Sequence, residues 1–80
     1  MDMQNLLHMA NKIGSFFASM PDHEEALQGI SGHIHSFWAP RMRSQLLAHV
    51  DTRNGEGLTP IVLEAILANR DSLKPQSELK

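Results

Sequence analysis

Histidine is the residue type of this sequence that most directly suggests a metal site, because imidazole is a common metal ligand. The 80-residue chain has five histidines and no cysteine, and His33 and His35 form the closest pair. On a helix, residues two positions apart point about 200° apart, whereas chelation needs partners three or four positions apart. His8, His23 and His49 have no His or carboxylate at those spacings. We therefore expect no metal site in this chain.

Other residues that could do chemistry also lack the required arrangement. Glu24 and Glu25 are adjacent, so their carboxylates diverge on a helix, and acids in a first turn are favoured by the helix dipole. The segment Gly55-Glu56-Gly57 has neither the preceding strand nor the Lys-Ser/Thr pair of a phosphate-binding loop. No Ser, His and Asp set stands in an ordered catalytic motif. We expect no catalytic or cofactor-binding residue, so the chain is not an enzyme by itself.

Composition restricts the class of protein further. The chain is 41% hydrophobic with a formal net charge of −2, so it is an ordinary globular sequence without a field that attracts nucleic acid. A core of this size is at the lower limit of independent stability, and there are no thiols to form disulfides. The apolar runs are too short to cross a bilayer, and the N-terminus lacks a secretory signal. We expect a cytoplasmic protein with no nucleic-acid or membrane partner.

The spacing of apolar residues predicts an all-α fold. Apolar side chains recur at three- and four-residue steps, and no segment alternates with period two. Asp2 and Asp22 are suited to be N-caps, and Pro40 and Pro60 to be first helical residues. The predicted helices are 2–19, 22–38, 40–50 and 60–70, with a turn-forming segment at 51–57. Residues 1–70 then form one helical domain, and 71–80 a flexible C-terminal tail.

The junction between the second and third predicted helices has an unusual composition. Phe37 continues the apolar stripe of its helix and is expected in the core, whereas Trp38 lies one step off that stripe. Trp, Arg and Met are enriched at protein–protein interfaces. Trp38, Pro40, Arg41, Met42 and Arg43 are therefore candidate interface residues. The alternative is that Trp38 fills the elbow between the two helices and that the arginines are solvated.

A second candidate contact is Phe16, at the edge of the apolar stripe of the first predicted helix. Two other functions are open at this stage. A DNA-binding helix-turn-helix is one, because Arg41, Arg43, Arg53 and Arg70 lie in the second half of the chain. Its reading helix, however, would carry only Asn69 and Arg70 near its end. The other is a self-associating helical domain that forms a homodimer when isolated.

Four segments resemble one known family. They are Met9-Ala10-Asn11-Lys12-Ile13-Gly14-Ser15-Phe16-Phe17 with Pro21, Ile34-x-x-Phe37-Trp38-x-Pro40-Arg41-Met42-Arg43, Leu46-Leu47-x-His49, and Gly57-Leu58-x-Pro60. In this order and at this spacing, the sequence resembles the delta subunit of NAD-dependent, molybdenum-containing formate dehydrogenase over about residues 5–68. Lys12 stands where the family often has Gln, which is a change on the solvent face.

The resemblance implies a non-catalytic accessory subunit of a cytoplasmic formate dehydrogenase complex. In that family the catalytic (alpha) subunit holds molybdopterin guanine dinucleotide and iron–sulfur clusters. A further subunit with FMN reduces NAD⁺, and the delta subunit carries no redox centre. The resemblance therefore implies that this chain binds no cofactor, contacts the catalytic subunit and supports assembly or stability of the complex.

Overall fold

The computed structural model describes residues 2–75, which form five helices and no strand. The helices are α1 (Met3–Ala18), α2 (His23–Phe37), α3 (Pro40–Arg53), α4 (Pro60–Ala68) and α5 (Arg70–Leu73). The prediction of a small all-α fold is confirmed.

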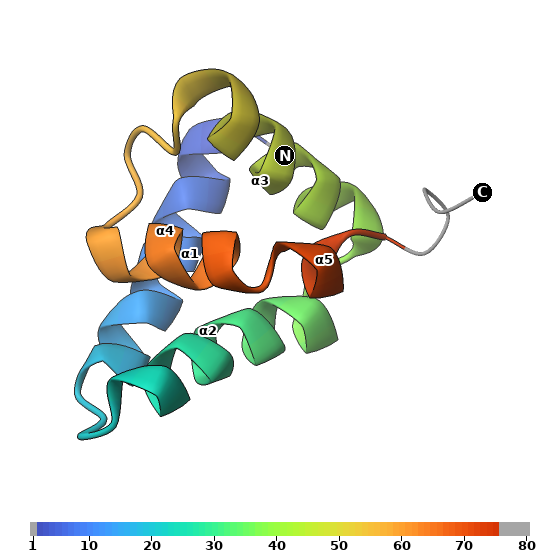
Figure 1. Ribbon diagram of the computed structural model, residues 1–80. Coiled ribbons are helices and arrows are strands. Elements are labelled where there is room, and N and C mark those ends of the chain that lie inside the picture. The colour runs from blue at the N-terminus through green and yellow to red at the C-terminus, as the bar shows by residue number, and fades with distance from the viewer. Residues whose placement is uncertain (1, 76–80) are drawn as a thin grey trace.

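The first three helices follow one another around three sides of a triangle, and α4 with α5 lies across its opening (Figure 1). α4 packs against α1 and α2, while α5 packs against α2 and α3. The core therefore lies beneath the α4–α5 segment, and each helix contributes to it. Its largest fully buried side chains are Leu6, Ile30, Ile34, Leu46, Val62, Ile66 and Leu73.

Local sequence signals explain where the helices begin. The Asp2 carboxylate accepts a hydrogen bond from the Gln4 amide at 2.9 Å, and that of Asp22 accepts one from the Glu24 amide at 2.9 Å. Such caps satisfy amide groups that have no partner inside the helix. Pro40 is the first residue of α3, where its missing N–H costs nothing. These predicted helix starts are confirmed.

The predicted end of the third helix is wrong by three residues. α3 continues to Arg53, and the chain reverses only at Asn54, whose φ of 57° is left-handed. Gly55 and Gly57 also have positive φ, at 71° and 94°. The predicted turn-forming segment includes Asp51, Thr52 and Arg53, but none of these residues has a left-handed backbone. The positions that do need it are the ones that end the helix.

The expected tail also begins too early. Residues 71–73, predicted to lie in a flexible tail, belong to α5, and Leu73 is 1% exposed in the core. The Arg43 guanidinium Nη1 donates to the Leu73 carbonyl oxygen at 3.3 Å and holds α5 against α3. The described part of the chain is therefore structured to Pro75, and residues 76–80 of the predicted tail lie outside it.

Gly14 permits a close approach of α1 and α4. It is buried, and a Cβ placed on it would overlap the Val62 Cγ2 methyl. One turn earlier, the Asn11 side chain contacts the segment that leads into α4. Its Nδ2 donates to the Gly57 carbonyl oxygen at 2.9 Å, and its Oδ1 accepts from the Thr59 amide at 3.0 Å. Asn11 and Gly14 thus fix the position of α4 on α1.

Candidate functional site

Trp38 fills the elbow between α2 and α3. For this residue the sequence left two interpretations, a surface contact or a plug of the elbow. The Trp38 side chain belongs to the hydrophobic core and is 6% exposed, and its backbone N–H donates to the Ile34 carbonyl oxygen at 3.0 Å. This burial supports the second interpretation. In this conformation the indole does not lie on the surface with the other candidate contact residues.

Phe37 occupies the exposed position instead. It is 75% exposed, so its predicted place in the core is wrong. The buried residues of α2 include Ala26, Ile30 and Ile34, and Trp38 follows at the same four-residue step. Because each residue turns about 100° around a helix, Phe37 and Trp38 lie on either side of the centre of that face, so helical spacing alone does not separate them. Trp38 is the C-cap, where the chain turns from α2 into α3, and its ring joins the core there.

The other candidate contacts at this junction differ in exposure. Pro40 and Arg41 are exposed, whereas Met42 and Arg43 are half-buried. Met42 packs against the core, and Arg43 donates to the Leu73 carbonyl oxygen. Pro40 and Arg41 are therefore the predicted contact residues of the junction that lie on the surface, three and four residues after the exposed Phe37.

Phe16 lies on a separate surface. Its ring is 73% exposed and meets the Phe17 ring edge to face, with centroids 5.0 Å apart. Phe16 belongs to the last turns of α1, next to the start of α2, whereas Phe37 ends α2. The axial rise of α2 from His23 to Phe37 is about 21 Å. The predicted contact residues thus belong to two surfaces at opposite ends of α2.

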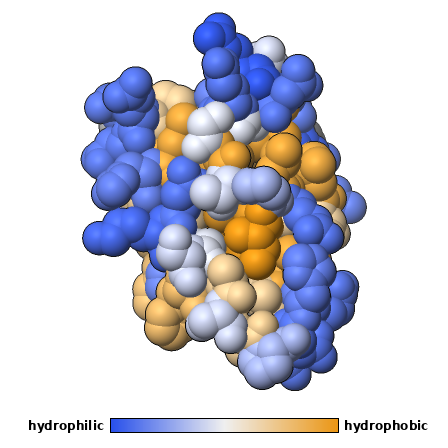
Figure 2. Space-filling model, turned by 90° about the vertical axis from the view of Figure 1, so that its left-hand side faces the viewer, coloured by the Kyte–Doolittle hydropathy of each residue, from blue (hydrophilic) through white to orange (hydrophobic). Residues whose placement is uncertain are grey.

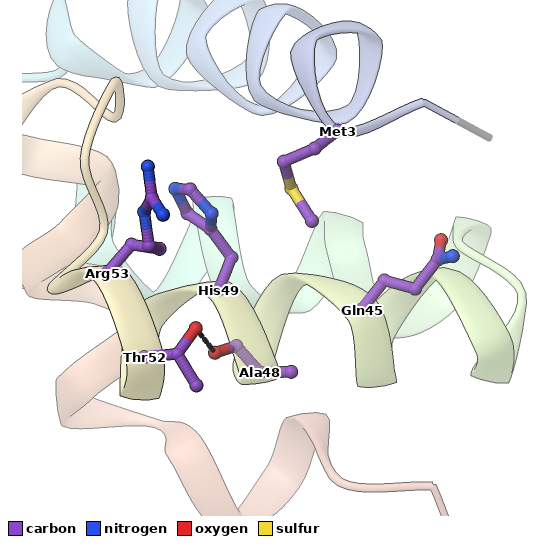
Figure 3. A pocket seen from close by; sticks show the side chains of 6 residues that line it. All are labelled: Met3, Gln45, Ala48, His49, Thr52 and Arg53. Carbon is purple, nitrogen blue, oxygen red and sulfur yellow. Dashed lines mark hydrogen bonds between the residues drawn. The ribbon is translucent and has the colours of Figure 1, made fainter.

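An open depression of about 490 Å³ lies between the N-terminus of α1 and α3 (Figure 3). It is lined by Met3, Gln45, Ala48, His49, Thr52 and Arg53. The polar groups of three lining residues already have intramolecular partners. His49 Nε2 lies 2.7 Å from the Glu56 carbonyl oxygen, Thr52 Oγ1 donates to the Ala48 carbonyl oxygen at 2.8 Å, and Arg53 forms an ion pair with Glu56. These contacts are local, because they join α3 to itself or to the turn that follows it.

The histidines are dispersed. His23 Nε2 lies 3.0 Å from Glu64 Oε1 on α4, and the His33 ring packs against Phe37 with centroids 4.7 Å apart. Within residues 2–75, no group of three or more His, Cys, Asp or Glu side chains could hold a metal ion.

The two side chains that would read DNA in a helix-turn-helix have other partners. Asn69 Nδ2 donates to the Ser31 hydroxyl at 3.1 Å, and the Arg70 guanidinium forms an ion pair with Asp51. Ser31 in turn donates to the Ala65 carbonyl oxygen at 3.0 Å, so this polar group links α2 to α4 in the interior. These contacts disfavour a DNA-reading role for the end of α4.

A further apolar area lies on the face shown in Figure 2, bordered by hydrophilic residues. This face contains the segment between α3 and α4 and the start of α4, which lie at the left of Figure 1. Leu58, Ile61 and Leu63 on these elements are half-buried and pack against the core. Their exposed parts are therefore the outer edge of the core.

No helix within the described residues is long and apolar enough to cross a membrane.

The structure so far defines a small helical domain with exposed aromatic residues near both ends of α2. The family model of the NADH-dependent formate dehydrogenase delta subunit, FdsD, matches residues 5–66. The chain belongs to this family, as the four sequence segments predicted. Comparison with curated proteins gave no match, and neither did comparison with solved structures.

Proposed function

We propose that this chain is a non-catalytic accessory subunit of a cytoplasmic NAD-dependent formate dehydrogenase. In this proposal it binds the catalytic (alpha) subunit and supports the assembly or stability of the complex. The family match over residues 5–66 is the observation that carries the proposal.

The proposal assigns the redox chemistry to the partner subunits. Molybdopterin guanine dinucleotide, iron–sulfur clusters, FMN and NAD are expected there, together with the oxidation of formate to CO₂ and the reduction of NAD⁺. Iron–sulfur clusters are held mainly by cysteine thiolates, and this chain has no cysteine. In this proposal, the chain contributes to the assembly or stability of the complex through its contact with a larger subunit.

Co-expression of the other formate dehydrogenase subunits with and without this chain tests the proposal. With the chain present, we expect it to co-purify with the catalytic subunit and to raise the yield of assembled complex. Molybdenum content, iron content and NADH formation from formate are the measurements. If the chain does not co-purify and the complex forms equally well without it, the proposal is wrong.

The same system separates assembly from stability. Purified chain is added to a complex that was made without it, and the half-life of formate oxidation at elevated temperature is measured. Recovery of the normal half-life indicates stabilisation of the finished complex. A requirement for co-expression indicates a role during assembly.

A further inference from the structure

An exposed aromatic and cationic surface lies where α2 meets α3, at the right of Figure 1. We call it the Phe37 corner and define it by His33, Phe37, Pro40 and Arg41, all of which are exposed. The Phe37 ring packs on the His33 ring, with centroids 4.7 Å apart. Large exposed aromatic side chains are common anchors of protein interfaces.

Core packing and backbone hydrogen bonds fix the backbone of the Phe37 corner. The side chain of Trp38 is buried, and its backbone N–H donates to the Ile34 carbonyl oxygen at 3.0 Å. The Arg43 amide donates to the Ala39 carbonyl oxygen at 3.1 Å, which closes the first turn of α3. A contact surface with a fixed backbone loses little conformational entropy on binding. The Phe37 corner is thus pre-organised to contact a partner.

The charge around the Phe37 corner is positive, although the whole chain has a net charge of −2. Residues 26–50 contain Arg41 and Arg43 but no Asp or Glu. The neighbouring helix α5 brings Asp71, whose carboxylate pairs with Lys74 at 3.8 Å. Among the residues that the structure describes, no hydrogen bond or ion pair engages the Arg41 guanidinium. Phe37 and Arg41 are both exposed and lie four residues apart across the junction. Together they are complementary to an apolar site bordered by carboxylates.

We propose that the Phe37 corner docks on an acidic surface of the large formate dehydrogenase subunit. The Phe37 ring enters an apolar pocket there, and Arg41 pairs with a carboxylate at the rim of that pocket. This inference rests on the proposed function, and it adds which surface of the chain makes the contact and which chemistry the partner presents.

Of the two predicted contact surfaces, the proposal selects the Phe37 corner and leaves Phe16 outside the interface. Phe16 is then a matched comparison, because it is 73% exposed and Phe37 is 75% exposed. It lies at the other end of α2, near Asp22, Glu24 and Glu25 in sequence. The test compares Phe37→Gln, Arg41→Glu and Phe16→Gln in the full chain. Binding to the isolated large subunit is measured by biolayer interferometry at low and high salt. Circular dichroism checks that each variant is folded, and if Phe37→Gln is unfolded, Arg41→Glu decides the test.

We expect Phe37→Gln to raise the Kd about 30-fold, as for an interface hot spot, and Phe16→Gln to leave it unchanged. Arg41→Glu should weaken binding and reverse its salt dependence, because an attractive charge pair becomes a repulsive one. If wild type binds but Phe37→Gln and Arg41→Glu bind equally well, the docking surface is wrong while the proposed function stands. If wild type does not bind, both are wrong.

Two other outcomes overturn the proposal by identifying a different occupant. Sedimentation could show that the chain is a homodimer and that Phe37→Gln dissociates it without changing binding to the large subunit. The Phe37 corner would then be a self-association surface. Alternatively, the chain could bind duplex DNA, and Arg41→Glu could abolish that binding without changing binding to the large subunit. The Phe37 corner would then be a nucleic-acid-binding surface.

Discussion

Gly14 and Gly32 are both helical glycines, but their surroundings are opposite. At Gly14 in α1, an added Cβ would overlap Val62 Cγ2 and lie 3.5 Å from Ile61 Cγ2. At Gly32 in α2, an added Cβ would meet no atom within 4 Å. Replacement by alanine therefore increases the intrinsic stability of each helix by the same amount, but only Gly14→Ala disturbs the packing.

The expected free energies of unfolding follow from these surroundings. Alanine is favoured over glycine inside a helix by about 1 kcal/mol. Overpacking a close-packed core costs about 1–3 kcal/mol, and Val62 is fully buried with a stiff, β-branched side chain that cannot move aside easily. For Gly14→Ala, an overpacking cost of about 2 kcal/mol, the middle of this range, is partly offset by the helical gain of about 1 kcal/mol. Gly14→Ala should therefore lower the free energy of unfolding by about 1 kcal/mol. Gly32→Ala should raise it by about 1 kcal/mol.

Thermal and urea unfolding, followed by circular dichroism, measure the difference. For a domain of this size, 1 kcal/mol corresponds to a shift of about 4–8 °C in Tm, so the two variants should shift Tm in opposite directions. Gly14→Ala in a Val62→Ala background provides the control, because the methyl group that causes the overlap is then absent and the penalty should disappear. A Gly14→Ala variant as stable as Gly32→Ala would refute the close approach of α1 and α4.

Three further substitutions test the fold by the same unfolding measurements. Trp38→Ala should cost about 3–5 kcal/mol, as for a large buried aromatic, and a loss below about 1 kcal/mol would mean that the indole is not in the core. Asn11→Ala removes both hydrogen bonds to the segment before α4 and should cost about 1–2 kcal/mol; unchanged stability would show that these bonds add nothing. Ser31→Ala should cost about 1 kcal/mol because the α2–α4 polar link is broken, whereas the exposed Ser36→Ala should be neutral.

Helix starts and the main apolar stripes could be predicted because they depend on local chemistry. Asp2 and Asp22 cap α1 and α2 through amides two residues away, and Pro40 fixes the start of α3 through its own ring. α5 could not be found in this way. It spans Arg70–Leu73, which is too short to show a helical period, and it is held by tertiary contacts such as the burial of Leu73.

Tertiary contacts also decide the roles of the glycines. Gly29 and Gly32 both lie inside α2, but the Phe17 ring packs against Gly29 whereas Gly32 is open. The close approach of helices occurs at Gly14, which the periodicity of α1 did not single out. Such contacts depend on which helices pack together, and the spacing of apolar residues along one helix does not contain that information.

The sequence did not show which of the two aromatic residues at the α2–α3 junction is exposed. Phe37 and Trp38 are adjacent, so a small error in the centre of the buried face of α2 exchanges the core residue and the surface residue. This exchange matters for any binding experiment, because Trp38→Ala would weaken binding by destabilising the fold beneath the corner. A loss of binding in that variant would therefore not show that the indole touches the partner. Phe37 and Arg41 separate the two effects, since both are exposed and their replacement leaves the core intact.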